Sequence, residues 1–527
     1  MPAADQTPAT TDLTLVLDAN DPSQAAGQAE SDHPPATSVK AEPETPAPSA
    51  PNALASLPPA RKHALLLVFS LAMFIDSAGL SAMFVMTAPV ATDLGIALAN
   101  QPWVIGSYAL AFASTLLFAG RVADLFPPNV VYTAGFFGLG VFHLAISFVA
   151  DALALYILRA MSGLLASLTV PAAINMIVQM YPDPAEQGRK LGVFGTAGPL
   201  ANTLALVLAG GLVMASWRWY FRFIAILVIP FSALAWVLMP RTAAVAGDVG
   251  QGEKWRRMDL GGVVLMLGTL VCFILALTQG PLDGWSKPAF IAPIVISAAL
   301  LPAFVVYEQR LPRGYSLLPH DIWRFPNIFP LMIQATVPIL FFSVLQLRMA
   351  SWFQETLHES AIIAALKLLP MGVVAVLGGV ATQFVPVLTG RPRVVQPMAT
   401  LLVFTGLMVL AFSSGRDYWR WIFPAELVGT SGCIVVFIGM NTAIIQAFPL
   451  EFAGVGGSFA NVVFQLGGIV GVAVQTALVA ADGEVDGWRG TQNSYFFAGG
   501  WVLAVGVVFV LWYKQDKMPG GAGAAAV

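Results

Sequence analysis

Hydrophobic residues are gathered into long runs, separated by short stretches that hold most of the charged residues and prolines. About 20 mainly apolar residues are needed for a helix to cross the hydrocarbon core of a bilayer. By this measure the pattern predicts fourteen membrane spans. If the seventh and eighth were peripheral, twelve would remain. The predicted spans are 64–88, 102–119, 130–150, 152–180, 189–213, 218–239, 259–279, 288–307, 327–350, 361–386, 394–413, 420–447, 453–480 and 494–514.

The first 62 residues lack any run of this length. They contain eleven prolines and no Phe, Trp or Tyr. Before Arg61 there are eight acidic residues and a single basic one, Lys40. Such a segment cannot bury enough apolar area to offset the entropy of ordering. We therefore expect a disordered tail.

Composition supports a membrane protein. Hydrophobic residues make up 57% of the 527 residues and charged residues only 10%, with a mean hydropathy of +0.75. Soluble domains carry about 25% charged residues, so a soluble enzyme is excluded. The net charge of −3 argues against a nucleic-acid partner. Cys272 and Cys433 lie in apolar runs without metal-ligand spacing, and we expect no metal and no cofactor.

Lys and Arg are distributed unevenly between the two sides of the predicted spans. Cytoplasmic segments of membrane proteins carry an excess of these residues. With the N-terminus in the cytoplasm, sixteen fall on the cytoplasmic side and seven on the opposite side. The bias predicts a multi-pass protein with both termini cytoplasmic, in the cell membrane or an internal membrane.

The sequence contains neither a motif for ATP binding nor an arrangement of residues typical of an enzyme. No GxxxxGK[ST] motif occurs, and the loops are too short for a nucleotide-binding domain. No span holds the paired carboxylates or Ser/His arrangement that catalysis requires. The chain is thus expected to be a secondary transporter and not an enzyme.

Ionisable residues that fall inside predicted spans include Arg159, Asp76, Glu426 and Lys367, whose side chain is expected to extend outward to the membrane surface. Arg159 costs roughly 2.5–3.5 kcal/mol to insert into lipid, so it is expected to face the interior of the helix bundle. Asp76 lies near the middle of the first span, where burial disfavours its charged form, as suits a proton carrier. Glu426 is a second candidate proton site. Purely structural roles remain open: Arg159 satisfied by carbonyls, and Asp76 orienting polar groups.

Four short motifs follow one another in the first half of the chain. They are GRVADLF at Gly120–Phe126, YILRAMSG at Tyr156–Gly163, GTAGP at Gly195–Pro199 and SWRWYF at Ser216–Phe221. In this order they resemble the signature motifs of the major facilitator superfamily, most of all its fungal fourteen-span drug:proton antiporter branch. The segment 259–307 is similar to that branch's inserted central pair of spans.

The resemblance implies an all-α membrane protein of the major facilitator fold, with two six-helix bundles and two inserted central helices. The implied parts are a disordered cytoplasmic tail at 1–62, an N-terminal six-helix bundle at 63–240, a linker with two additional transmembrane helices at 241–310, a C-terminal six-helix bundle at 311–515 and a short cytoplasmic tail at 516–527.

The resemblance also implies roles for individual residues. Arg159 would take part in proton coupling. Gly120 and Asp124 would belong to a gating loop, where Asp124 caps a neighbouring helix end. Gly195, Gly198 and Pro199 would form an antiporter-like motif whose bend shapes the interface between the bundles and limits leak.

Polar residues within the spans are candidates for a substrate cavity. A cavity with few charges suits neutral or weakly charged amphipathic organic molecules. The expected function is proton-coupled export of drugs, toxins or secondary metabolites by a monomer, with the substrate, protons and the bilayer as partners. Uptake or facilitation of a nutrient or a small inorganic solute such as ammonium or borate stays open, as does a non-transporting receptor. The cavity candidates are Gln101, Tyr108, Asn175, Asn202, Asn441, Asn461 and Gln465.

Overall fold

The computed structural model describes most of the chain after residue 52. Part of the predicted N-terminal tail, the start of the linker at 241–257 and the C-terminal tail at 516–527 lie outside the described residues. The described residues are 53–97, 100–240, 258–312, 315–316, 322, 325, 327–385, 388, 391–448, 453–481 and 487–514.

The described residues form an all-helical membrane protein, and fourteen of its segments are long and apolar enough to span a membrane. The predicted number of spans is therefore confirmed. The first eight are α1 (Pro59–Leu94), α2 (Pro102–Leu125), α3 (Pro128–Ile146), α4 (Ala152–Met180), α5 (Pro184–Val213), α6 (Trp217–Leu238), α8 (Leu260–Asp283) and α9 (Pro288–Arg310).

The later spans include two composite segments. The ninth combines α10, α11 and the π-helix η3, and the twelfth combines the π-helix η4 with α15. The elements are α10 (Ile328–Ala335), α11 (Val337–Ser351), η3 (Trp352–Thr356), α12 (Ala361–Phe384), α14 (Pro392–Ala411), η4 (Tyr418–Ile422), α15 (Phe423–Ala447), α16 (Ala453–Ala481) and α17 (Arg489–Trp512).

Local sequence explains where the first helices begin and end. α1 starts at Pro59, inside the predicted tail, because proline in the first helical turn costs no hydrogen bond. It ends at Gly95, which adopts a left-handed conformation at φ 63°. α2 continues past the predicted boundary at 119 and ends before Pro127 and Pro128, so the segment that was expected to be a loop is helical.

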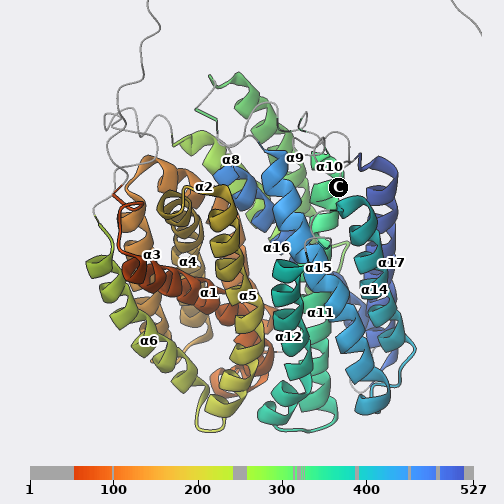
Figure 1. The fold of residues 1–527 in the computed structure, drawn as a ribbon. Helices are drawn as coiled ribbons and strands as arrows, with labels where there is room; N and C mark the ends of the chain where they lie inside the picture. The colour runs from red at the N-terminus through yellow and green to blue at the C-terminus, as the bar shows by residue number, and fades with distance from the viewer. Residues whose placement is uncertain are drawn as a thin grey trace, which may run out of the picture. The chain divides into compact units, whose positions relative to one another are not determined.

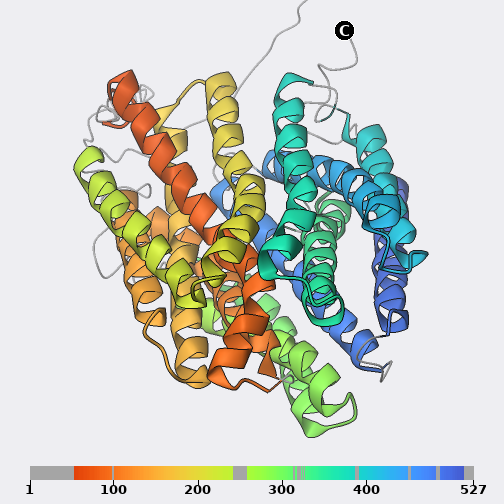
Figure 2. The ribbon, with the colours of Figure 1, turned by 90° about the horizontal axis from the view of Figure 1, so that it is seen from below.

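The helices form two groups, α1–α6 and α10–α17, that lie side by side (Figure 1). Between the groups, α5 packs along α12 and α2 packs against α16. The inserted α8 contacts both α2 and α16, while α9 packs chiefly against α8. The α8–α9 pair lies at one edge of the junction between the two groups (Figure 2). We call the end of the molecule where α1 begins the near end, and the end where α1 finishes the far end.

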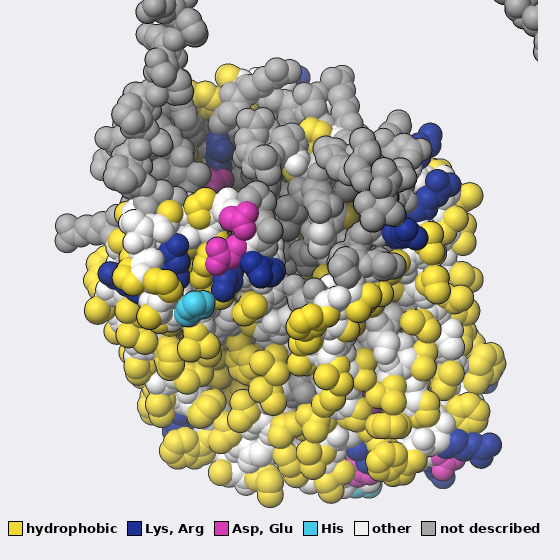
Figure 3. Space-filling view, in the orientation of Figure 1, with side chains coloured by type: hydrophobic (Ala, Val, Ile, Leu, Met, Phe, Trp, Pro, Cys, Tyr) yellow, Lys and Arg dark blue, Asp and Glu magenta, His cyan; other side chains and the backbone are white. Residues whose placement is uncertain are grey.

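The outer surface has the character of a lipid-facing one. Hydrophobic side chains cover the middle of the face in Figure 3, and charged side chains gather above and below them. Large apolar side chains lie mostly exposed on the described part of the chain, including Phe148, Val237 and Phe384. A water-soluble protein rarely exposes a continuous apolar surface of this kind, whereas a membrane protein requires one.

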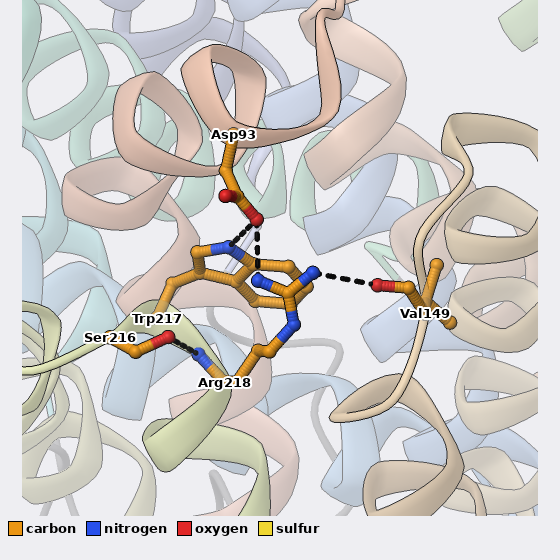
Figure 4. Close-up of polar contacts among 5 residues, drawn as sticks. All are labelled: Asp93, Val149, Ser216, Trp217 and Arg218. Carbon is orange, nitrogen blue, oxygen red and sulfur yellow. Dashed lines mark hydrogen bonds and ion pairs between the residues drawn. The ribbon is translucent and has the colours of Figure 1, made fainter.

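A polar cluster fixes the far end of the first group (Figure 4). Asp93 Oδ2, in the last turn of α1, accepts from Trp217 Nε1 at 2.9 Å and pairs with Arg218 Nη1 at 2.5 Å. Arg218 Nη2 also donates to Val149 O at 2.9 Å. The cluster thereby ties α1, the start of α6 and the connection between α3 and α4 together.

Candidate transport cavity and its ionisable residues

A cavity of about 810 Å³ lies between the two helix groups. Its lining on α1 runs from Met73, in the middle of the helix, to Ala88 near the far end. On the second group it runs from Asn461 to Ala480 along α16 and reaches Glu355, an exposed residue at the far end. The cavity therefore opens at the far end.

The near end is closed by tight helix packing. A Cβ added to Gly120 of α2 would lie 2.9 Å from Ser458 Oγ of α16, closer than van der Waals contact allows. A Cβ there would force the Ser458 side chain to shift, so the two groups approach closely at this point. The two groups also touch at the far end, where Gly210 of α5 packs on the backbone of Ala361 at the start of α12.

Asp76 lies on the cavity wall and is 5% exposed. The Tyr108 hydroxyl donates a short hydrogen bond to Asp76 Oδ1. The Tyr108 ring packs directly on Gly79 of α1, where a Cβ would lie at an ordinary van der Waals distance of 3.6 Å from the ring. The sequence predicted Asp76 in this environment, but it did not predict the tyrosine partner.

Arg159 is 1% exposed and lies behind Tyr108. Its Nη2 donates to Gly79 O at 3.2 Å, and its guanidinium carbon lies 5.2 Å from the centre of the Tyr108 ring. No ion pair joins Asp76 to Arg159 in the described part of the chain, so Tyr108 is the link between them. Both expected features of Arg159, burial in the bundle and a carbonyl acceptor, are present.

Gly163, which ends the YILRAMSG motif, explains how α4 reaches this site. A Cβ at this position would lie 2.4 Å from Tyr108 O and 3.1 Å from Phe112 N. α2 and α4 therefore touch backbone to backbone at the level of Tyr108. Tyr220, in the SWRWYF motif, holds α6 to α1 by donating to Ala78 O at 2.9 Å.

The interpretation of Asp124 as a loop residue that caps a neighbouring helix is wrong in its geometry. Asp124 lies inside the last turn of α2, because the helix continues to Leu125. Its Oδ1 accepts from Asn175 Nδ2 of α4 at 3.0 Å. Asn175 therefore holds α2 to α4 within the first group, and it does not line the cavity.

The glycines of the GTAGP motif occupy different surroundings. A Cβ at Gly198 would face α1, 3.3 Å from Ser77 Oγ and 3.4 Å from Met73 Cε. Pro199 lines the cavity. A Cβ at Gly195 would meet nothing within 4 Å. Among the described glycines, Gly210, beyond the motif, makes the closest approach of α5 to α12.

The polar candidates divide into two sets. Gln101, Asn202, Asn461 and Gln465 line the cavity, whereas Tyr108, Asn175 and Asn441 are not among its lining residues. Asn202 Oδ1 accepts a short hydrogen bond from Ser81, which joins α5 to α1 on the wall. Apolar and aromatic side chains supply much of the remaining wall, including Phe84, Phe112, Phe342, Phe437 and Phe464.

Sequence reasoning missed the charged residues near the mouth of the cavity. Arg348 and Glu355 both line it. Arg348 Nε donates to Thr491 Oγ1 of α17 at 2.6 Å. The prediction ended this span at 350, two residues after Arg348, but the helix continues through η3 to Thr356. The apolar Trp352–Phe353 pair that follows was the available signal.

Glu426 is fully buried in α15, and it does not line the cavity. Lys367 does not extend freely toward the membrane surface, because its Nζ pairs with Glu359 Oε1 at 2.5 Å and lies 4.7 Å from the centre of the Phe353 ring.

At the near end, Lys62 and Lys190 lie over the Tyr181 ring at 5.5 and 5.3 Å. Burial raises the pKa of Tyr181 above its usual value, with a smaller contribution from Glu186.

A metal centre finds no support in the described residues, which contain no group of three or more His, Cys, Asp or Glu side chains able to hold an ion.

The model of one protein family, the Major Facilitator Superfamily, matches residues 66–472. The chain belongs to the major facilitator superfamily. The family resemblance predicted from the four motifs is thereby confirmed.

Several superfamily members resemble the chain over most of its length. The puromycin resistance protein pur8 of Streptomyces alboniger is 28% identical, over 83% of this chain and 89% of that protein. The efflux pump terJ of Aspergillus terreus is 24% identical, over 84% of this chain and 85% of that protein. The predicted branch, drug efflux transporters that include fungal members, agrees with these relatives.

Solved structures agree with the fold. A crystal structure of the peptide transporter POT in complex with sulfate matches with a TM-score of 0.60 at 16% identity, covering 85% of this chain and 94% of that one. The human organic anion transporter MFSD10 matches with a TM-score of 0.58 at 14% identity, covering 86% of this chain and all of that one. The predicted major facilitator fold with fourteen spans is confirmed.

Proposed function

We propose that this chain is a secondary active transporter of the cell membrane that exports small organic compounds in exchange for protons. The observation that carries the proposal is a carboxyl group, Asp76, on the wall of a cavity that is open at one end and closed at the other. The names of the resistance and export proteins among the relatives support the direction of transport.

The cavity favours amphipathic substrates. Its wall combines aromatic side chains with a few amide groups, including Gln101, Asn202 and Gln465. Apolar surface binds the body of an organic molecule, and scattered amides fix its orientation. A cavity of about 810 Å³ is in the size range of pockets that hold drug-sized molecules.

Proton exchange follows from the way Asp76 is held. Tyr108 donates to one carboxyl oxygen, and the other oxygen is left to bind a proton taken from water in the cavity. When the proton leaves, the resulting carboxylate keeps the Tyr108 hydrogen bond, and Arg159 supplies a positive charge on the other side of the tyrosine ring. Arg159 thus acts as a positioning residue, because a guanidinium does not itself release a proton near neutral pH.

Transport requires that the cavity open alternately to the two sides of the membrane. With both termini in the cytoplasm, as the distribution of Lys and Arg favours, the far end faces outward and this conformation is open to the outside. An exporter in this state releases its substrate and takes up a proton. Closing the far end and separating Gly120 from Ser458 would then open the cavity to the cytoplasm, where the proton leaves.

The test uses the full chain reconstituted into vesicles, with puromycin as the first probe and pH gradients imposed in both directions. We expect puromycin to cross the membrane in the direction opposite to the protons. Asp76→Asn should abolish the dependence of puromycin transport on the pH gradient. The control is Asp151→Asn, which removes an exposed carboxylate but keeps a good N-cap for α4.

If Asp76→Asn vesicles respond to the pH gradient like the wild type, Asp76 is not the coupling residue. Movement of puromycin in the same direction as protons would indicate uptake. If neither puromycin nor a wider panel of antibiotics moved under either gradient, the export proposal would be wrong and a non-transporting receptor would be favoured.

A further inference from the structure

A second buried carboxyl group lies in the other helix group, away from the Asp76 site. Glu426 of α15 is 0% exposed, and neither of its carboxyl oxygens has a hydrogen-bond partner among the described residues. The Thr430 hydroxyl, one turn further along the same helix, is likewise buried and unpartnered. Transferring an ionised carboxylate into such surroundings without a partner is far more costly than transferring the neutral acid. In this conformation Glu426 therefore holds a proton.

The ionisable groups around Glu426 are few. Tyr418 of η4 and Tyr495 of α17 lie within electrostatic reach of it. α10 and α16 carry no ionisable residue, and Arg393 stands only at the opposite end of α14. Lys367 of α12 is already paired with Glu359.

Glu426 does not line the cavity, but neighbouring residues connect its surroundings to the cavity wall. Tyr495 lies within electrostatic reach of both Glu426 and Arg348 of α11, and its hydroxyl has no hydrogen-bond partner among the described residues. Arg348 lines the cavity and donates to Thr491, which is one turn before Tyr495 on α17. Tyr495 and Arg348 are thus the polar groups that link the surroundings of Glu426 to the cavity wall.

The arrangement is similar to that in the first group with the charges exchanged. The two halves of this fold are repeats related by an axis along the membrane normal. In the first group the fourth helix, α4, carries Arg159, the first helix carries Asp76 near its middle, and Tyr220 comes from the sixth. In the second group the fourth span carries Glu426, the first carries Arg348, and α17, the last, carries Tyr495. Each group thus encloses one carboxyl, one guanidinium and a tyrosine.

We infer that Glu426 is a second proton-binding site, so that each transport cycle moves one proton on Asp76 and another on Glu426. The proton enters from water in the cavity when Tyr495 and Arg348 move apart. It binds a carboxylate oxygen and leaves to water when the cavity faces the other side, where the Arg348 guanidinium stabilises the carboxylate that remains. The inference rests on the proposed transport function only for the count of protons per cycle.

The first experiment detects the proton without any substrate. Purified full-length protein in lipid is titrated with acid and base, and infrared difference spectra are recorded in the region of the carboxylic acid C=O stretch. We expect a band at neutral pH that Glu426→Gln removes and Asp76→Asn does not. Asp417→Asn is the matched control, because it removes an exposed carboxylate just before the same span and should leave the band unchanged. If the Glu426→Gln spectrum equals that of the wild type at neutral pH, Glu426 is not protonated and the inference is wrong.

The second experiment counts protons. In vesicles the ratio of protons to puromycin is measured from the membrane potential that halts transport. We expect Glu426→Gln to lower that ratio by one, and an unchanged ratio overturns the inference. If wild-type vesicles do not transport puromycin, the proposed export function is in question, while the infrared spectra still decide whether Glu426 binds a proton.

Discussion

Replacing Gly163 by alanine should weaken the hydrogen bond between Tyr108 and Asp76, because it should displace α2. The added Cβ would lie 2.4 Å from Tyr108 O, whereas ordinary contact begins near 3.4 Å, so α2 and α4 must separate by about 1 Å. Both contacting atoms belong to backbone and cannot rotate away. Overpacking of this kind costs about 1–3 kcal/mol. Because Tyr108 moves with α2, its hydrogen bond to Asp76 should lengthen or break, and proton-driven transport should fall more than folding does.

The measurement is reversible unfolding in mixed detergent–SDS micelles, followed by transport in vesicles. Gly195→Ala is the matched control, because a Cβ there meets nothing within 4 Å and alanine favours the helix by roughly 0.5–1 kcal/mol. We expect Gly163→Ala to be less stable than the wild type and Gly195→Ala to be at least as stable. Equal stability and equal transport for the two variants would refute the close contact of α2 with α4.

Three further variants test separate contacts. Tyr108→Phe keeps the ring over the buried guanidinium but leaves Asp76 without its donor; we expect about 1–3 kcal/mol lower stability and a loss of pH-driven transport, whereas unchanged pH dependence would contradict the hydrogen bond. Asp93→Asn breaks a partly exposed ion pair with Arg218 and should cost only about 0–1 kcal/mol in micelle unfolding; a larger loss would show that this cluster matters more than its exposure indicates. Gly120→Val should push α2 from α16 and raise proton leak across vesicles without substrate, and a leak equal to that of the wild type would argue against closure at this point.

The number of spans was predictable because apolar length alone decides whether a helix can cross a bilayer. The end of α2 was not, because Arg121 and Asp124 made the segment after 119 look like a loop. Charged side chains are tolerated in the last turn of a spanning helix, and only Pro127 and Pro128 stop it. The position of Asp124 therefore depended on the helix boundary, which sequence locates least well.

Membrane depth identified Asp76, Arg159 and Glu426 as residues of interest, since ionisable groups are rare within spans. Their partners depend on how the helices are rotated and packed. Tyr108 lies where α2 packs on Gly163 of α4 and on Gly79 of α1, and hydropathy does not reveal such contacts. For the same reason Asn175 could not be recognised as a partner of Asp124 rather than a cavity residue.

The inserted α8 touches a helix of each group, α2 on one side and α16 on the other, and it lends Ile274 and Leu277 to the cavity wall. If the two halves rock against each other in the proposed transport cycle, the contacts of this helix with at least one of them must change during every turnover.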